Sequence, residues 1–256
     1  MSLDLQQAAR RALSLIDLTL LGERAAHADV VRLAASAATP HGAPAALCIW
    51  PECIGTARGE LDGHGLSAVR IASVANFPDG SADARRAVRE TADGIAAGAD
   101  EVDLVLPYRA LLAGETDMVR GLLRDCREAA GARCLKVILE TGELGSAAMI
   151  AEASRIALEA GADFLKTSTG KAAVGATPQA AQIMLAAIAR HGSGGFKAAG
   201  GIRRVTEVLP YLELADALFG PGWATPARFR IGASALLQDV LAVLDGLGET
   251  PGSDGY

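Results

Sequence analysis

Lysine is scarce in this chain of 256 residues. Of its 24 Lys and Arg residues only four are lysines, so arginine supplies the other twenty cations. The lysines are Lys136, Lys166, Lys171 and Lys197, and three of them interrupt apolar segments. A guanidinium stays protonated, whereas a desolvated lysine loses its proton readily, so arginine cannot replace a lysine that works as a neutral amine. The alternative for each lysine is a pair with a carboxylate or an ammonium that reaches solvent.

Other absences exclude whole classes of protein. The formal net charge of -6 and the lack of interleaved aromatic and basic residues argue against a nucleic-acid-binding surface. No apolar run approaches the roughly 20 residues that a membrane-spanning helix needs, and the first residues lack a cleavable apolar leader. We therefore expect a cytoplasmic protein that binds neither nucleic acid nor membrane.

Cysteine and histidine are also few. The four Cys form no Cys-x-x-Cys pair and, without a secretory signal, are typical of reduced thiols. Cys48 has no evident histidine partner, which favours a buried structural thiol over a nucleophile. The four His are scattered and match no metal-ligand spacing. We expect neither a metal nor an organic cofactor.

Short apolar runs alternate with longer stretches of helical period, as in βα units around a parallel sheet. Dividing the chain among eight runs gives about 32 residues each, close to one βα unit of a barrel. The pattern predicts a single α/β domain, a (β/α)8 TIM barrel over residues 1–246, and a flexible tail over 247–256. A doubly wound open sheet is the alternative, although GSGGFKAAGG lacks the dinucleotide-binding spacing. The runs cover residues 14–20, 46–50, 69–75, 101–106, 134–140, 164–168, 195–199 and 228–232.

A short tetrapeptide that occurs twice supports the repeated βα unit. The tetrapeptide AGAD occurs at residues 97–100 and again at 160–163, each time directly before an apolar run. Its glycine is expected to end a helix. The helix expected over 147–160 has its apolar residues largely on one face, which would pack on the barrel.

Charged residues within the runs predict the chemistry. Asp103, Lys136, Lys166 and Lys197 all lie on strands, whose carboxyl ends carry the functional groups of a barrel. A second ammonium nearby disfavours the charged form of Lys166, and desolvation does the same. A neutral lysine can attack a carbonyl and form an iminium, an electron sink that allows a neighbouring carbon–carbon bond to break or form.

Glycine-rich turns follow three of the expected strands and predict an anion site. They are Gly170-Lys171, Gly200-Gly201 and Gly232-Ala233-Ser234. Backbone N–H groups at such turns and at a helix N-terminus bind anions, and barrels often bind phosphate after strands seven and eight. Each pair alone is more often only a tight turn. The spacing around Gly170 excludes a Walker loop.

Together these segments resemble deoxyribose-phosphate aldolase, a family of class I aldolases that reversibly cleave 2-deoxy-D-ribose 5-phosphate into acetaldehyde and D-glyceraldehyde 3-phosphate. The resemblance covers nearly the whole chain. It rests on DLT (17–19), CIWP (48–51), VANFPDG (74–80), EVDLVLPYRALLAG (101–114), LKVILETGEL (135–144), AGADFLKTSTGK (160–171), GFKAAGGIR (195–203) and FRIGAS (229–234).

The resemblance implies a role for each matching residue. Lys166 would form the Schiff base, Lys197 would disfavour its charged form and relay a proton, and Asp103 with a water would move the proton of the substrate C3 hydroxyl. Lys136 would be a supporting charge, or a strand lysine held by Asp103 or Glu140. The implied substrate and phosphate contacts are Asp17, Thr19, Thr169, Lys171, Gly200, Gly201, Gly232 and Ser234.

The sequence departs from the family at two positions. Ala198 stands where the family commonly has Pro, and Ala235 where a second Ser often follows Gly-Ala-Ser. Some members end in a Tyr that assists proton transfer at C2, so Tyr256 is a candidate for that role; the alternative is a disordered terminus.

Other functions fit parts of the pattern. A transaldolase-like or isomerase barrel would act on a related sugar phosphate, and a silent phosphosugar-binding barrel would need no deprotonated amine. An Ala/Leu-rich helix face would allow a homodimer.

Overall fold

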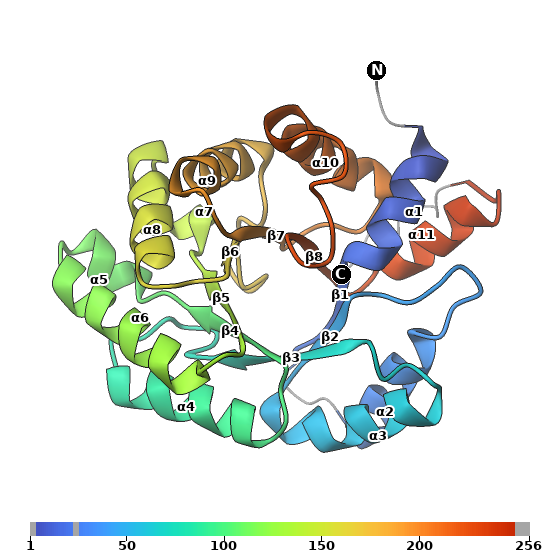
Figure 1. The fold of residues 1–256 in the computed structure, drawn as a ribbon, viewed down its shortest axis with the longest axis horizontal. Coiled ribbons are helices and arrows are strands. Elements are labelled where there is room, and N and C mark those ends of the chain that lie inside the picture. Colours follow the sequence, from blue (N-terminus) through green and yellow to red (C-terminus); the bar gives the residue numbers. More distant parts are fainter. Residues whose placement is uncertain (1–3, 23–25, 249–256) are drawn as a thin grey trace.

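The computed structural model describes residues 4–22 and 26–248, and they form a closed barrel of eight parallel strands (Figure 1). Each strand pairs with its neighbours in chain order, and β8 pairs with β1 to close the ring. The predicted barrel is confirmed, and each predicted strand lies within a few residues of an observed one. The strands are β1 (Ile16–Leu20), β2 (Ala46–Ile49), β3 (Arg70–Ala75), β4 (Glu101–Val105), β5 (Cys134–Ile138), β6 (Phe164–Lys166), β7 (Gly195–Ala199) and β8 (Phe229–Ala233).

Helices surround the barrel (Figure 1). The predicted helix over 147–160 is observed as α8, and on its polar face Arg155 pairs with both Glu152 and Glu159. At the chain's start, α1 packs against α10 and α11 and against β8. The helices are α1 (Leu5–Leu15), α2 (His27–Ser36), α3 (Ile54–Gly63), α4 (Ala84–Ala96), α5 (Tyr108–Leu112), α6 (Thr116–Ala130), α7 (Thr141–Leu144), α8 (Ala147–Glu159), α9 (Pro178–His191), α10 (Val205–Phe219) and α11 (Leu236–Leu244), with a 3-10 turn η1 (Pro51–Cys53).

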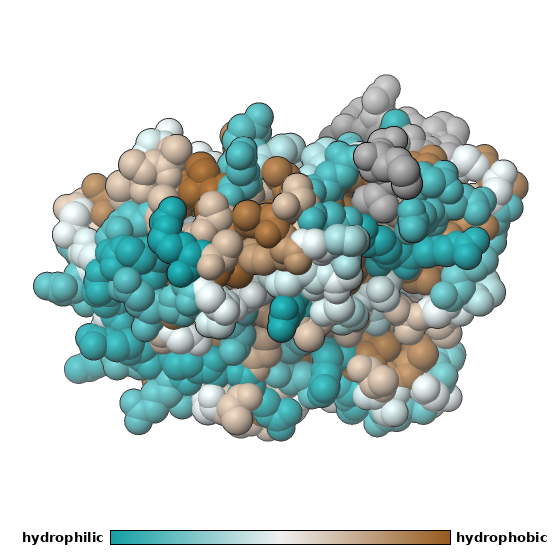
Figure 2. Space-filling model, turned by 45° about the horizontal axis from the view of Figure 1, so that its top comes forward, coloured by the Kyte–Doolittle hydropathy of each residue, from teal (hydrophilic) through white to brown (hydrophobic). Residues whose placement is uncertain are grey.

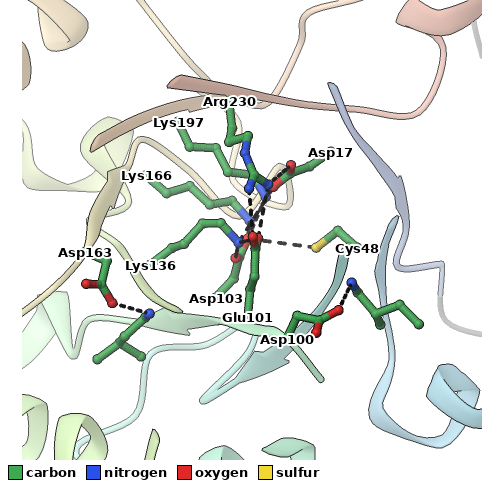
Figure 3. A network of polar contacts seen from close by, with 12 residues as sticks. Asp17, Cys48, Asp100, Glu101, Asp103, Lys136, Asp163, Lys166, Lys197 and Arg230 are labelled. Carbon is green, nitrogen blue, oxygen red and sulfur yellow. Dashed lines mark hydrogen bonds and ion pairs between the residues drawn. The ribbon is translucent and has the colours of Figure 1, made fainter. Parts of the chain in front are cut away.

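The two AGAD segments form matching corners. Gly98 and Gly161 both have positive φ and follow the ends of α4 and α8, as predicted. The aspartate side chain of each corner then accepts a hydrogen bond from the backbone of the preceding strand (Figure 3). Asp100 accepts a hydrogen bond from the backbone N–H of Ile71 at 2.9 Å, and Asp163 accepts one from Leu135 at 2.8 Å. The repeated tetrapeptide therefore locks a helix end to a neighbouring strand twice.

The outer surface is mixed. On the face shown in Figure 2, hydrophobic residues gather in patches within a largely hydrophilic surface. Among the described residues the exposed large hydrophobic side chains are Leu112, Val174, Leu218 and Leu247. No helix within 4–22 or 26–248 is long and apolar enough to cross a membrane.

Candidate active site

Charged side chains fill the centre of the barrel (Figure 3). Seven strand residues take part, and each is at most 5% exposed. The carboxylates are Asp17, Glu101 and Asp103, and the cations are Lys136, Lys166, Lys197 and Arg230. Buried charges are tolerated only when they are paired and hydrogen-bonded, so each of these residues needs a partner of opposite charge.

Asp103, at the middle of β4, is the hub of this cluster. Its Oδ2 accepts hydrogen bonds from Lys166 Nζ and from Lys197 Nζ, both at 2.7 Å. Its Oδ1 accepts one from Lys136 Nζ at 2.9 Å. The three lysines come from the consecutive strands β5, β6 and β7, so the predicted convergence of one aspartate and three lysines is observed.

Asp17, on β1, holds the other side of the cluster. Its Oδ2 accepts a hydrogen bond from Lys197 Nζ at 2.5 Å, and its Oδ1 accepts one from Arg230 at 2.7 Å. Thr19 lies two residues further along β1 and donates its hydroxyl to the backbone oxygen of Asp17 at 2.8 Å. Lys197 therefore lies between two carboxylates, and it shares the Oδ2 atom of Asp103 with Lys166.

Lys136 is a strand lysine held by carboxylates. Besides Asp103 it contacts Glu101 Oε2 at 2.5 Å and Asp17 at 3.8 Å. Of the two partners considered from the sequence, Asp103 is the observed one. Glu140 binds the turn after β6 instead.

The cluster shifts the ionisation of its members. Burial raises the pKa of Asp103, but the charges of Lys136, Lys166 and Lys197 together hold it well below the usual range. Burial lowers the pKa of Lys197, and the opposing carboxylates Asp103 and Asp17 raise it above the usual value. The pKa of Lys136 is raised in the same way. Lys197 and Lys136 therefore stay protonated and Asp103 stays ionised.

Cys48 is fully buried on β2, as expected for a structural thiol. Its Sγ lies 3.8 Å from Asp103 Oδ2. Burial raises the pKa of this thiol, although the nearby Lys197 opposes the rise. Cys48 is therefore a neutral neighbour of the cluster.

The turn after β6 is built around Glu140, which lies two residues beyond the end of β5. Glu140 adopts a left-handed φ of 54°, and its carboxylate accepts hydrogen bonds from the Thr169 hydroxyl at 2.5 Å and from the Thr169 N–H. The Thr169 hydroxyl also accepts a bond from the Lys171 N–H at 3.0 Å. The Lys171 side chain is exposed. This chain of contacts fixes the course of the backbone at Gly170.

Two glycines allow the loops after β6 and β7 to touch. The backbone oxygen of Gly200 accepts a hydrogen bond from Ala176 at 3.0 Å. A Cβ on Gly175 would lie 2.3 Å from that oxygen, so only glycine fits there. Gly200 and Gly201 also have φ values of 95° and 86°, which favour glycine. The expected anion turns at β6 and β7 are therefore in contact.

The third expected turn differs from its prediction. The sequence predicts a turn at Gly232-Ala233-Ser234, but β8 continues to Ala233, so Gly232 is a buried residue within the strand. Ser234 is exposed and stands just before α11. The predicted boundary is wrong because the consecutive small residues at 232–234 give no clear signal for the end of a strand. Tyr256 and residues 249–256 of the expected tail lie outside the described residues.

A comparison with known families decides the class of this site. Residues 11–238 match the DeoC/LacD family aldolases. The chain therefore belongs to the DeoC/LacD aldolase family. Its substrates are accordingly small molecules, and its activity is that of an aldolase, a lyase.

Solved structures resemble this DeoC/LacD aldolase over almost its whole length. A deoxyribose phosphate aldolase from Aeropyrum pernix, described as tetrameric, is 26% identical with a TM-score of 0.70, covering 95% of this chain and 92% of that one. A Coccidioides immitis protein, provisionally described as a deoxyribose-phosphate aldolase, is 28% identical with a TM-score of 0.79, covering 94% and 88%. A Toxoplasma gondii structure with a TM-score of 0.86 is 24% identical, covers 94% and 97%, and supports the fold.

Three residues of this aldolase site were missed by the sequence reasoning. Glu101 is the first residue of β4 and Arg230 the second of β8, and a charge near the start of a strand is as typical of the surface as of a barrel interior. Glu140 was considered only as a partner of Lys136. The one available signal was the spacing of Glu101 and Asp103, because residues two apart on a strand face the same side.

Proposed function

We propose that this chain is a deoxyribose-phosphate aldolase, which reversibly cleaves 2-deoxy-D-ribose 5-phosphate into acetaldehyde and D-glyceraldehyde 3-phosphate. One observation carries the proposal: Lys166 and Lys197 both bind the same oxygen of Asp103 at 2.7 Å. A Schiff-base site needs a nucleophilic lysine, whose neutral form a second cation nearby favours, and aldol cleavage needs a group that moves a hydroxyl proton. This arrangement supplies both.

Lys166 is the best-placed nucleophile. It is the last residue of β6, at the carboxyl end of the barrel where active sites form. It is 3% exposed, whereas Lys136 and Lys197 are fully buried. Lys136 and Lys197 each contact at least two carboxylates, and Lys166 contacts Asp103. A substrate carbonyl therefore reaches Lys166 first.

The chemistry begins with iminium formation. The lone pair of neutral Lys166 attacks the C1 aldehyde, and the carbonyl oxygen takes up a proton to give a carbinolamine. Loss of water leaves the iminium between the lysine nitrogen and C1. Lys197, kept protonated between Asp17 and Asp103, disfavours a second ammonium at Lys166 and supplies the relayed proton.

Carbon–carbon cleavage follows. Asp103, acting through a water, accepts the proton of the C3 hydroxyl, and the C2–C3 bond breaks as C3 becomes the aldehyde of glyceraldehyde 3-phosphate. The bonding electrons move into the iminium and give an enamine. Protonation at C2, which Tyr256 is proposed to assist, and hydrolysis then release acetaldehyde. Deleting Tyr256 tests that role, because proton exchange on acetaldehyde should slow.

The phosphate is proposed to lie against the turns after β6, β7 and β8. Gly200 and Gly201 offer backbone N–H groups at one turn, and Lys171 adds a cation at the next. The N–H groups near Ser234, at the start of the nine-residue helix α11, would complete the cradle. Asp17 and Thr19 lie on β1, which pairs with β8, and they would contact hydroxyls of the sugar.

The decisive experiment is reductive trapping. The protein is incubated with acetaldehyde and borohydride, and its peptides are analysed by mass spectrometry. We expect an adduct of about 28 Da on Lys166 that is absent in Lys197→Leu. Cleavage of 2-deoxyribose 5-phosphate in the same preparation should depend on Lys166. Absence of an adduct on every lysine would overturn the proposal.

Substrate profiling separates the remaining candidates. A transaldolase-like enzyme would transfer a larger ketose fragment, and an isomerase would release no acetaldehyde. A silent phosphosugar-binding barrel would bind the substrate without trapping. The proposed role belongs to deoxyribose phosphate catabolism in the cytoplasm, without a metal or organic cofactor, in a monomer or homodimer.

A further inference from the structure

Glu101 and Arg230 form a charge pair at the opposite end of the barrel from the proposed substrate. They come from β4 and β8, which are not neighbours, and so meet across the barrel interior. Arg230 donates to Glu101 at 2.7 and 3.1 Å. Both residues line an open cavity of about 1120 Å³ together with Arg70, Cys134 and Phe164, which begin their strands. The pair therefore closes the amino-terminal end of the barrel.

This pair is joined to the reacting end by continuous ion contacts. Glu101 contacts Lys136 at 2.5 Å, Lys136 contacts Asp103 at 2.9 Å, and Asp103 contacts Lys166 at 2.7 Å. On the other side, Arg230 contacts Asp17, which contacts Lys197. Figure 3 shows these side chains converging. Removing the charge of Glu101 or of Arg230 should therefore change the electrostatic potential at Lys166.

The charges of this cluster do not balance when every lysine is protonated. The three carboxylates Asp17, Glu101 and Asp103 face the four cations Lys136, Lys166, Lys197 and Arg230, which leaves one positive charge in excess. Removing one proton balances the cluster. Arg230 cannot release it, and Lys136 and Lys197 are each held by two carboxylates at short distance. Lys166 can release it with the smallest loss of ion pairing.

We propose that Glu101 and Arg230 are positioning residues that set the protonation of Lys166 from the far end of the barrel. This inference rests on the proposed Schiff base at Lys166. Arg230 contacts both Asp17 and Glu101 and holds Asp17 ionised, and Glu101 holds Lys136 charged. Neither residue touches the substrate, because both lie beneath the lysines, at the end where the strands begin.

Titratable groups on several elements surround Lys166. They come from β1, β2, β4, β5, β7 and β8 and from the segment after β5. Apart from Glu101 and Arg230, they are Asp17, Cys48, Asp103, Lys136, Glu140 and Lys197. Cys48 is a neutral thiol. Glu140 binds Thr169, and no ion pair of the described residues joins it to the seven charged residues of the cluster, so it is left out of the charge count.

Opposite substitutions in the pair should have opposite effects. Glu101→Gln keeps the shape of the side chain but removes a negative charge, so Lys166 should lose its proton more readily. The acid side of the trapping profile should then move to lower pH. Arg230→Met removes a positive charge, so the profile should move to higher pH. Each shift is expected to be about one pH unit, or about tenfold in rate on the acid side.

The measurement is the rate of borohydride trapping of acetaldehyde on Lys166 as a function of pH. Wild type, Glu101→Gln, Arg230→Met, Arg230→Lys and the Glu101→Gln/Arg230→Met double variant are compared. Arg230→Lys keeps the charge and should keep the wild-type profile. The double variant removes one charge of each sign and should also return toward it. A purely structural pair would not give shifts of opposite sign that cancel.

The outcomes are distinguishable. If wild type forms no adduct on Lys166, the proposed function fails. If wild type is trapped but the Glu101→Gln profile does not move to lower pH, the positioning role is wrong and the Schiff base stands. Should Arg230→Met not fold, the sign of the Glu101→Gln shift and the unchanged Arg230→Lys profile still decide.

Discussion

A side chain at Gly232 would press against Lys197: a Cβ built there lies 3.0 Å from Lys197 Cε and 3.0 Å from Ala199 Cβ. Gly232 is thus an interior strand residue whose missing side chain leaves room for the lysine. The close contact predicts that Gly232→Ala displaces the Lys197 ammonium by a few tenths of an ångström from Asp17 and Asp103. We expect a loss of roughly tenfold in kcat, since small misplacements near reacting groups are costly.

That prediction is checked by steady-state kinetics beside a thermal unfolding curve. Gly222→Ala would be an unsuitable control, because Gly222 has a positive φ of 107°. Gly121→Ala is better, since nothing lies within 4 Å of a Cβ there and the residue is helical. It should keep the wild-type kcat. An unaltered kcat in Gly232→Ala would show that Lys197 tolerates the contact.

The buried carboxylates predict a loss of stability in acid. Burial raises the pKa of Asp17, but Lys197, Arg230 and Lys136 lower it overall, and Asp103 behaves alike. These carboxylates stabilise the fold fully at any pH above their pKa in the unfolded chain, which is about 3.9. This stabilisation is lost as the pH falls toward their lower pKa values in the folded protein. The urea midpoint of unfolding should therefore fall steeply between about pH 4 and pH 2.

Asp17→Asn separates this effect from general acid unfolding. It should destabilise the protein by about 3–5 kcal/mol at neutral pH, because Lys197 and Arg230 each lose a buried partner. It should also show a shallower dependence on pH than the wild type. Asp62→Asn, at an exposed helix position, should keep the wild-type slope. If the stability of Asp17→Asn and of wild type depended on pH equally, Asp17 would not be a source of the loss of stability in acid.

Removing the hydroxyl of Thr169 should weaken phosphate binding selectively. Its hydroxyl joins Glu140 to the Lys171 N–H, so Thr169→Val should loosen the turn while keeping its volume. We expect KM for 2-deoxyribose 5-phosphate to rise by about tenfold, equal to the loss of about one hydrogen bond, with kcat little changed. Unphosphorylated 2-deoxyribose is the control substrate, and its kinetics should not change. A comparable rise for both substrates would place Thr169 elsewhere.

A substitution at Ala235 tests whether backbone N–H groups or a side-chain hydroxyl bind the phosphate after β8. It precedes α11 with φ -97° and ψ -19°, a helical conformation rather than the extended one in which a serine caps a helix. If backbone N–H groups bind the phosphate, Ala235→Ser should leave KM within about twofold of wild type, because a surface substitution has a small effect. A large fall in KM would show that a hydroxyl is needed.

The sequence predicted the barrel well because strand and helix periods differ clearly in this chain. It also predicted the meeting of Asp103 with three lysines, since residues inside parallel strands of a barrel point to one interior. It could not predict Arg230 against Glu101, because that contact joins strands that are not neighbours and depends on closure of the ring. The role of Glu140 depends on a left-handed backbone that glutamate rarely adopts.

The scarcity of lysine has a practical consequence for chemical modification. Lys136, Lys166 and Lys197 are at most 3% exposed, whereas Lys171 is exposed. An amine-directed label or immobilisation resin would therefore meet a single accessible lysine side chain, and it stands in the proposed phosphate turn. Amine coupling would therefore place the label or resin at that turn, whereas coupling through carboxylates would leave the turn open.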